Sequence, residues 1–534
     1  MPIEKPNSET KPVSMMPIAD ALRTVQRPKF LGITFDDAMH YFFRGNATLS
    51  IIVLFLIIIF LFKEGGGFFS QNVKNLEIYR KAGLEYVDIV RTRVDNHRTL
   101  GRFLGELRTK QLNLLNGDES ALAGYDAAVE RFSVTIDDFQ GFVSEYTEVA
   151  AGIKEKFKVG LDMEVAKVNF QKEGKFEESA KIVIPEIDFG VETQLFRDSI
   201  AQIKNFDEKF QTEVSSTLDS FPSMPSAELQ PQLEKFKSLV RLHQADVRQM
   251  EKSLEGWNWQ KPIPWYETFT SFVFGRNWLT ASFWQDWYGI IPLFIGSLMI
   301  AVTAILIAVP FAIGAAIYVN QVATKREQNI IKPYIEFVSA VPSVVWGFFG
   351  IAVVGQLIRV FSEQGMVAWV PFFPISERLN IATASCLLAI MAIPTIFSLA
   401  EDAIQNVPNA YTESSLALGA TKFQTIWIIM IPSALSGIVS AIILGLGRVI
   451  GETMVVLLCS GGRIQIPDFT NGLGIFFQPV HTMTGIIAQE MGEVVNGSIH
   501  YRALFMVGIV LFFVSLVLNY AAQQVVKRYK ISIG

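Results

Sequence analysis

The sequence predicts an all-α polytopic membrane protein with six membrane-spanning helices and a large helical insert outside the cytoplasm. Half of the 534 residues are hydrophobic and only 18% are charged, whereas charged residues make up about a quarter of an average soluble chain. The charged residues are absent from six long stretches and gather between them. This pattern excludes a soluble enzyme, and a net charge of −5 without a basic block argues against nucleic acid as a partner.

Each of the six charge-free stretches is long enough for a membrane-spanning helix, which needs about 20 mostly apolar residues. The stretch between Asp286 and Lys325 has room for two short helices, but Pro292 and Pro310 bracket a single apolar run, so we expect one span there with a long cytoplasmic end. The expected spans are residues 45–62, 289–313, 335–358, 379–400, 433–458 and 503–526.

Lys and Arg in the short loops predict that both termini are cytoplasmic. Residues 1–44 then form a cytoplasmic tail, and residues 63–287 lie outside the cytoplasm. Arg359 and Arg378 are exceptions on the outer side. We interpret the first span as an uncleaved anchor, because Lys63-Glu64-Gly65 follows it rather than a small-residue cleavage site. The basic residues on the expected cytoplasmic side include Lys325, Arg326, Lys332, Lys527, Arg528 and Lys530.

The insert at residues 63–287 is expected to form a helical hairpin or bundle. Proline is absent between Lys29 and Ile184, which favours long helices, since an interior proline costs about 3 kcal/mol. Apolar residues recur every three or four positions between Leu76 and Leu107, as in one amphipathic helix. The insert serves either as a spacer or scaffold, or as a docking surface for a binding protein or regulator. Further helices are expected near 120–157, 189–218 and 230–255, with Phe221–Pro225 separating the last two.

Tryptophans are concentrated at the end of the insert. Six of the nine lie between Trp257 and Trp287. Because tryptophan favours the membrane–water boundary, residues 257–288 are expected to lie along the outer interface and lead into the second span. Aromatic packing inside the insert is the alternative.

The loop at residues 401–422, between the fourth and fifth spans, is predicted to contain a short amphipathic helix on the cytoplasmic side. Pro408 is placed to open this helix and Gly419 to close it. Such a helix suits an element that receives mechanical work from another protein. An ordinary loop helix is the alternative.

This loop resembles the EAA motif of ABC importer permeases. Glu413, Ser414 and Ser415 are followed by three residues, Gly419, nine residues and a segment ending at Pro432, with the two serines in place of alanines. The resemblance implies that the loop is the coupling helix that contacts an ATPase subunit, through the set Glu413, Ser414, Ser415, Ala417 and Gly419. The chain lacks a phosphate-binding P-loop motif, so we expect no enzymatic activity in it and ATP hydrolysis in a separate subunit.

Two further stretches, residues 340–350 and 444–455, resemble the PstC family of phosphate-specific ABC permeases. The resemblance covers residues 288–534 and, weakly, the first span; the insert corresponds to an enlarged first periplasmic loop. It implies a type I ABC importer permease fold in the bacterial inner membrane. The implied partners are a PstA-like second permease, a PstB-like ATP-binding dimer, a PstS-like phosphate-binding protein and membrane lipid, and no cofactor or metal is expected.

Arg448 and Glu452 are the candidate substrate-pathway residues within the fifth span. Four positions apart in one helix, they would share a face. Counted from Pro432, Arg448 lies about 24 Å along that helix, toward the outer side. A guanidinium suits a phosphate oxyanion, and Glu452 could orient it or accept a hydrogen bond from protonated phosphate. A structural ion pair is the alternative. Thr453 and Ser343 complete the predicted pathway set.

Small residues and prolines accompany these charges. Gly447 and Gly451 allow close approach of a second helix, either from a partner permease or within the chain. Pro342-Ser343 and Pro394-Thr395 predict kinks that either free backbone groups toward a cavity or serve only packing.

The expected function is phosphate import by alternating access. A permease for another oxyanion or small solute is one alternative. A membrane sensor that uses the helical ectodomain is another, although a sensor should carry a signalling region after its spans and only residues 527–534 follow the last one.

Overall fold

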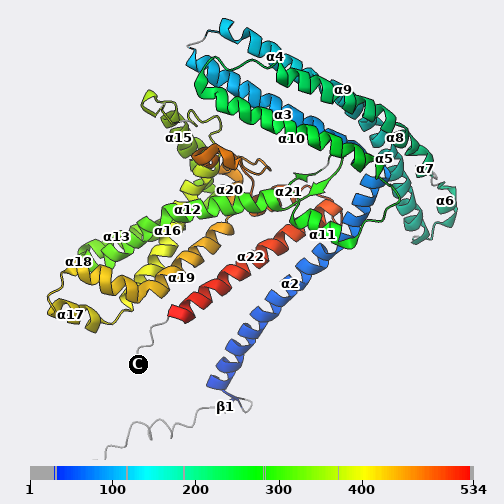
Figure 1. Cartoon of the computed structure of the whole chain (residues 1–534). Coiled ribbons are helices and arrows are strands. Elements are labelled where there is room, and N and C mark those ends of the chain that lie inside the picture. Colours follow the sequence, from blue (N-terminus) through cyan, green and yellow to red (C-terminus); the bar gives the residue numbers. More distant parts are fainter. Residues whose placement is uncertain are drawn as a thin grey trace, which may run out of the picture. The chain divides into compact units, whose positions relative to one another are not determined.

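A computed structural model describes most of the chain as helices (Figure 1). The described residues contain two antiparallel pairs of very short strands: β1 (Lys29–Phe30) with β2 (Ile33–Thr34), and β3 (Trp278–Leu279) with β4 (Trp287–Tyr288). The chain divides into two compact units, residues 1–63 and 64–534. Residues 1–28 of the predicted tail, and Lys530, lie outside the described residues, which are 29–30, 33–115, 118–172, 174–183, 187–280, 282, 284–367, 369–370 and 372–529.

Helix α2 (Phe35–Lys81) contains the first predicted span. Its side chains between Met39 and Phe62 are almost all exposed, although most are large and apolar. A contiguous apolar surface of this length is stable against lipid rather than against water.

The insert, which belongs to the second unit, is a bundle of long helices, as predicted. Helix α3 packs against α10 and α5, and α4 packs against α9 (Figure 1). The buried core is rich in aromatic rings, including Tyr86, Phe132, Phe196, Phe210 and Phe236. The helices are α3 (Leu84–Leu114), α4 (Ala123–Val134), α5 (Asp137–Lys172), α6 (Phe176–Lys181), α7 (Phe189–Glu192), α8 (Gln194–Asp198), α9 (Ile200–Asp219) and α10 (Gln230–Glu255), with 3-10 turns at Ser120–Leu122 and Ala227–Leu229.

The prediction of one helix from Leu76 to Leu107 was wrong. The chain breaks between α2 and α3, because Gly83 adopts a φ of +78°. The ring of buried Phe196 lies 2.4 Å from where a Cβ at this position would stand. A left-handed backbone and a side chain packed against it require glycine here.

Most of the tryptophan-rich segment packs inside the insert. Trp257 contacts the rings of Tyr86 and Phe196, and Trp259 contacts Phe189. The other packed members of the segment are Trp278 on Tyr288, Trp284 under the guanidinium of Arg91, and Trp287 on Tyr79. Aromatic packing therefore accounts for five of the six tryptophans. Trp265, on α11 (Trp265–Val273), is 79% exposed.

The remaining helices contain the other five candidate spans, which gives six in the described residues, as predicted. The stretch after Asp286 forms one span, Ile291–Val322, also as predicted. The helices are α12 (Ile291–Ile317), α13 (Lys325–Ala340), α14 (Ser343–Phe349), α15 (Gly355–Ser362), α16 (Ile381–Gln405), α17 (Asn409–Ala417), α18 (Lys422–Thr425), α19 (Ile431–Ile450), α20 (Met454–Cys459), α21 (Met483–Glu490) and α22 (Ile499–Tyr529).

Short π-helical and 3-10 segments join several of these helices. The π turns lengthen spans without breaking them, so the fifth span begins at Lys422 rather than at residue 433. It ends at Ile450 rather than at residue 458, because the helix breaks before α20. The third span begins at Ser343 rather than near residue 335, because α13 ends at Ala340 and Pro342 precedes α14. These segments are Tyr318–Val322, Gly350–Val354, Gly365–Val367, Ile426–Met430 and Phe469–Phe477.

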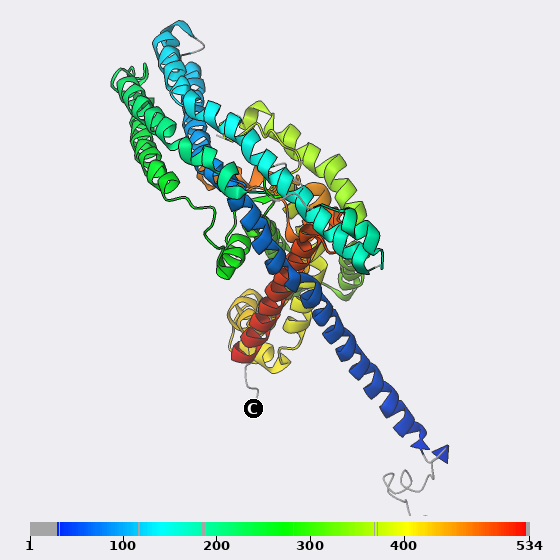
Figure 2. The ribbon, with the colours of Figure 1, turned by 90° about the vertical axis from the view of Figure 1, so that its right-hand side faces the viewer.

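Helix α16 is the centre of the membrane core. It packs against α12 and α19, and α22 lies alongside α19 (Figure 1, Figure 2). Small buried residues such as Ala308, Ala392 and Ala441 line these contacts. In a membrane, close approach of small residues lets helices gain van der Waals contact that lipid cannot replace. The core therefore holds α16 and α19 firmly against each other.

Candidate functional site

The backbone opens between α19 and α20, and Glu452 lies in this break. Helix α19 ends at Ile450 and α20 begins at Met454. The prediction that Arg448 and Glu452 share one helix face was therefore wrong. The break is stabilised by its own polar contacts: a carboxylate oxygen of Glu452 accepts from the Met454 amide at 3.2 Å, and its carbonyl accepts from Thr484 Oγ1 at 2.8 Å. Non-helical backbone at membrane depth requires such partners, or a water-filled cavity.

Arg448 lies in the last turn of α19, and its side chain is exposed. One guanidinium nitrogen donates a hydrogen bond to Thr395 Oγ1 on α16. Within the described residues, no ion pair joins Arg448 to Glu452 or to another carboxylate. The structural ion pair that competed with a substrate role is thus not formed. Arg448 carries a positive charge whose contact in the chain is a neutral hydroxyl.

Sequence reasoning noted Thr395 only as part of a proline kink and missed Thr484 entirely. Pro394 lies inside α16 and is buried, and Thr395 follows it on the side that meets α19. Thr484 lies on α21, and no local signal in the sequence links it to Glu452. The pairings arise from packing between helices that are distant in the chain.

Ser343 and Thr453, the other predicted pathway residues, are half-buried, and neither forms a hydrogen bond with Arg448 among the described residues. Ser343 opens α14, and this helix packs on α20 through Gly347, whose missing Cβ would lie 2.4 Å from the Leu458 side chain. Thr453 immediately precedes α20. The structure thus brings both residues to the helices around the break, without joining them to the guanidinium.

Among the described residues, Gly447 and Gly451 do not pack against another helix. A Cβ built at Gly447 meets nothing within 4 Å, and one at Gly451 meets only carbonyls of its own helix turn, at 3.6 Å. Packing within the chain, one of the two interpretations of this pair, is not found in the described residues. The small-residue face beside Arg448 is therefore open.

The loop between the fourth and fifth spans forms the predicted helix, α17, in nine residues rather than about eleven. Pro408 is its N-cap, and Gly419 at φ +88° terminates it. The Gly419 amide donates to Leu416 O at 3.0 Å and the Ala420 amide to Ser415 O at 3.2 Å. These two bonds form a complete Schellman motif, which fixes the end of the helix.

Side chains hold α17 on the base of the fifth span and leave an apolar tip outside. Buried Ser415 shares a hydrogen bond of 2.9 Å with Thr425, and Thr412 Oγ1 donates to Met430 Sδ at 3.1 Å. Leu418 is 89% exposed. Of the other predicted coupling residues, Glu413, Ser414, Ala417 and Gly419 are all exposed. The helix is a rigidly attached knob with a solvent-facing surface.

An ion pair that sequence reasoning missed stabilises the same end of the membrane core, on the other side of α16. Lys332 on α13 lies 3.0 Å from Glu401 on α16, and Asn320 also donates to Glu401 at 3.3 Å. Glu401 is buried. These contacts tie α13 and the end of the second span to the helix from which the loop emerges.

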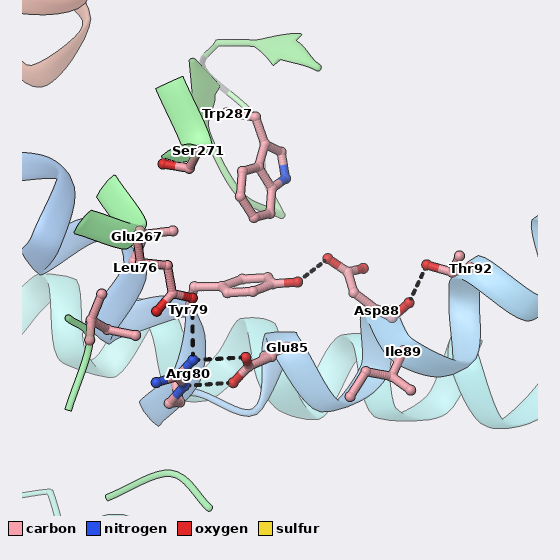
Figure 3. Close-up of a pocket in the computed structure, with 11 residues that line it drawn as sticks. Leu76, Tyr79, Arg80, Glu85, Asp88, Ile89, Thr92, Glu267, Ser271 and Trp287 are labelled. Carbon is pink, nitrogen blue, oxygen red and sulfur yellow. Dashed lines mark hydrogen bonds and ion pairs between the residues drawn. The ribbon is translucent and has the colours of Figure 1, made fainter. Parts of the chain in front are cut away.

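A cavity of about 300 Å³ lies in the insert where α2 meets α3 (Figure 3). Arg80 forms a bidentate pair with Glu85, at 2.8 and 3.0 Å, and lies 3.6 Å from Glu267. Tyr79 donates to Asp88 at 2.8 Å. Burial raises the pKa of the Asp88 carboxyl, against the hydrogen bonds that it accepts. These contacts span the break at Gly83 and are sufficient to explain the cluster as structural.

Comparison with known proteins matches the membrane core. Residues 308–531 match the family described as Binding-protein-dependent transport system inner membrane component. The probable ABC transporter permease protein YqgH of Bacillus subtilis is 30% identical over 244 residues, covering 46% of this chain and 74% of the relative. The phosphate transport system permease protein PstC of Pasteurella multocida is 28% identical over 274 residues (49% and 82%), and that of Haemophilus influenzae is 30% identical over 253 residues (45% and 78%).

Proposed function

Since the chain belongs to the family of binding-protein-dependent transport system inner membrane components, we propose that it is the permease subunit of an ATP-driven importer of inorganic phosphate. Relatives named phosphate transport system permease support the substrate. The observation that carries the proposal is Arg448: an exposed guanidinium in a membrane span, held by the neutral hydroxyl of Thr395.

The charge of Arg448 favours an anion as its missing partner. A cation within a membrane is costly unless it faces a cavity or an opposite charge. The guanidinium presents several donors in a planar fork that matches phosphate oxygens, and Thr395 engages one of them. The remaining donors are available to a dehydrated phosphate that crosses beside α19.

Glu452 supplies a second contact that discriminates between anions. Its carboxylate lies in the break that follows the last turn of α19, and it accepts a hydrogen bond from the Met454 amide. Such a carboxylate accepts a hydrogen bond from a protonated phosphate oxygen and repels fully ionised sulfate. It also weakens the hold of Arg448 on the anion, which permits release.

The proposed complex has two permeases, because a single chain leaves the face of Gly447 open beside Arg448. A PstA-like subunit occupies this face, and a PstS-like protein delivers phosphate from outside. A PstB-like ATPase dimer binds the α17 knob. ATP-driven movement of the ATPase subunits rocks the spans through α17, so that the pathway opens alternately to each side.

The proposed location is the inner membrane of a bacterial cell. Both termini are cytoplasmic, and residues 63–287 are periplasmic. The distribution of Lys and Arg in the short loops supports this orientation. It also places α17 and the Lys332–Glu401 pair on the cytoplasmic side, where ATP is available to an ATPase subunit.

Substitution of Arg448 tests the proposal. The complex with its partner subunits is reconstituted in vesicles, and ATP-dependent uptake of labelled phosphate and of sulfate is measured. Arg448→Gln should abolish phosphate uptake while the complex stays assembled. The matched control is Arg359→Gln, at an exposed arginine paired with Glu363 at 3.1 Å, and should transport normally. Phosphate uptake by Arg448→Gln at the wild-type rate, or a response to sulfate alone, would refute the proposal.

A further inference from the structure

The short helix α11 (Trp265–Val273), near the end of the insert, presents aromatic side chains to the outside. Trp265, Tyr266 and Phe269 are exposed on the helix, and Phe274 is exposed just beyond it. The other tryptophans of this segment pack against the insert, so they do not share this exposure. Several exposed aromatic side chains gathered on one short helix mark a site of interaction with another surface.

The opposite face of α11 is firmly attached to the protein. Phe272 is buried and its ring lies 5.2 Å from that of Phe68 on α2. Asn72 donates to Ser271 at 3.3 Å, and Glu267, the acidic residue of α11, is directed to Arg80 (Figure 3). The buried contacts of Phe272 therefore fix which side of the helix faces outward, and the carboxylate of Glu267 lies beside Arg80 on the protein side.

Backbone contacts fix α11 at the level where the second span begins. The Ile290 amide donates to Phe272 O at 2.9 Å and the Ile291 amide to Gly275 O at 3.3 Å. Ile291 is the first residue of the span Ile291–Val322. Gly275 and Gly289 let the two segments cross in backbone contact, since a Cβ at Gly289 would lie 2.3 Å from the Gly275 carbonyl carbon. The helix is thus fastened at the outer edge of the hydrocarbon layer.

Two cations flank the aromatic surface. Lys261 lies before α11 and Arg276 after it, and both are exposed. Neither side chain has a carboxylate partner among the described residues. Tryptophan and tyrosine favour the headgroup level of a bilayer, and basic side chains there meet lipid phosphates.

We propose that α11 lies in the headgroup region of the outer leaflet, with Trp265, Tyr266 and Phe269 among the lipids and Lys261 and Arg276 at their phosphates. This contact attaches the base of the insert to the membrane surface, in addition to the attachment that the membrane-spanning helices provide. The partner is a phospholipid surface rather than another protein.

Fluorescence quenching by brominated lipids tests this contact. The full chain is reconstituted with partner subunits into vesicles of phosphatidylethanolamine and phosphatidylglycerol, with or without bromine near the top of the acyl chains. The fluorescence of the wild type is compared with that of Trp265→Phe and of Trp259→Phe. The wild-type emission minus that of each variant gives the emission of the replaced tryptophan. Trp259 contacts Phe189 within the insert and serves as the control.

The emission of Trp265 should fall by more than half in brominated vesicles, and that of Trp259 should not change. An unquenched Trp265 would overturn the proposal, as would quenching that disappears when a soluble binding protein is added. Replacing both Lys261 and Arg276 by glutamate should reduce the quenching of Trp265 in these anionic vesicles. Unchanged quenching in the double variant would refute the part assigned to the two cations.

Discussion

Arg448 on α19 donates a hydrogen bond to Thr395 on α16, and this bond joins the exposed cation of the fifth span to the most buried helix of the core. Because α16 is packed on α12 and α19, the Thr395 hydroxyl holds the Arg448 guanidinium in a fixed position, and the other N–H donors of the guanidinium point away from this bond. Among the described residues Arg448 is not paired with Glu452, whose carboxylate accepts a hydrogen bond from the amide of Met454 instead.

Thr395→Val should lower ATP-dependent phosphate uptake by about tenfold or more, because a hydrogen bond to a charged group contributes about 1.5–3 kcal/mol. Valine keeps the shape of threonine and removes the hydroxyl. Thr395→Ser restores the donor–acceptor contact and should transport at close to the normal rate. Uptake by Thr395→Val equal to that of Thr395→Ser would show that the hydroxyl does not position Arg448.

Leu418→Asp should weaken association of the ATPase with the permease by about tenfold or more. Its side chain is almost fully exposed at the tip of α17, and burying a leucine in a partner contributes about 1.5–3 kcal/mol. The Schellman motif at Gly419 should persist, so the thermal stability of the permease should not change. The control is Leu242→Asp, at an exposed leucine on α10 of the insert. Equal co-purification of the ATPase with both variants would contradict the docking role of the knob.

Gly83→Ala should destabilise the insert by about 2 kcal/mol or more, because alanine is strained at a φ of +78° and its Cβ would overlap the ring of Phe196. Gly105→Ala provides a control that should change the stability of the insert in the opposite direction. Gly105 is exposed within α3, and a Cβ there meets nothing within 4 Å, so alanine should stabilise the helix slightly. Thermal melting of the two variants measures the difference. An unchanged melting temperature for Gly83→Ala would show that the break is not needed.

Two buried histidines should make the insert less stable in acid. The rings of His97 and His243 lie 5.5 Å apart in its core, and burial lowers the pKa of His97 to about 4 and that of His243 to about 3. Nearby Asp137 raises the pKa of His97, and Arg93 lowers that of His243. In the unfolded chain both pKa values are about 6.5, so unfolded molecules bind protons first as the pH falls.

The stability of the insert should therefore be full above pH 6.5 and decline toward pH 4, by as much as about 1.4 kcal/mol per pH unit for each histidine. Both ring nitrogens of His243 lack a hydrogen-bond partner, so His243→Leu should remove part of the pH dependence without leaving an unsatisfied group. Melting temperatures between pH 4.5 and 7.5 provide the measurement. A parallel pH dependence in wild type and His243→Leu would exclude this histidine as a cause.

Features that depend on neighbouring residues were predicted well from the sequence. Charge-free stretches located the six spans, Phe221–Pro225 separated α9 from α10, and Pro408 with Gly419 bounded the knob. Each of these signals acts locally, through side-chain transfer into lipid, a missing amide donor or a permitted positive φ.

Features that depend on distant partners were not predicted. The break after α19 needs Thr484 to satisfy the Glu452 carbonyl, and the break at Gly83 is explained by Phe196, which lies far away in the sequence. Thr395 similarly meets Arg448 only because α16 packs on α19. A helical period continues across both breaks in the sequence, so pattern alone favours an uninterrupted helix.

The most direct test of the account is phosphate uptake into vesicles that contain this chain alone or together with a second permease, an ATPase and a binding protein. If the chain is one of two permease subunits that an ATPase drives through α17, only vesicles with all the subunits and ATP should accumulate labelled phosphate. Omitting the ATPase should abolish this accumulation. Accumulation of phosphate by the chain alone, without any ATP-hydrolysing subunit, would contradict the account.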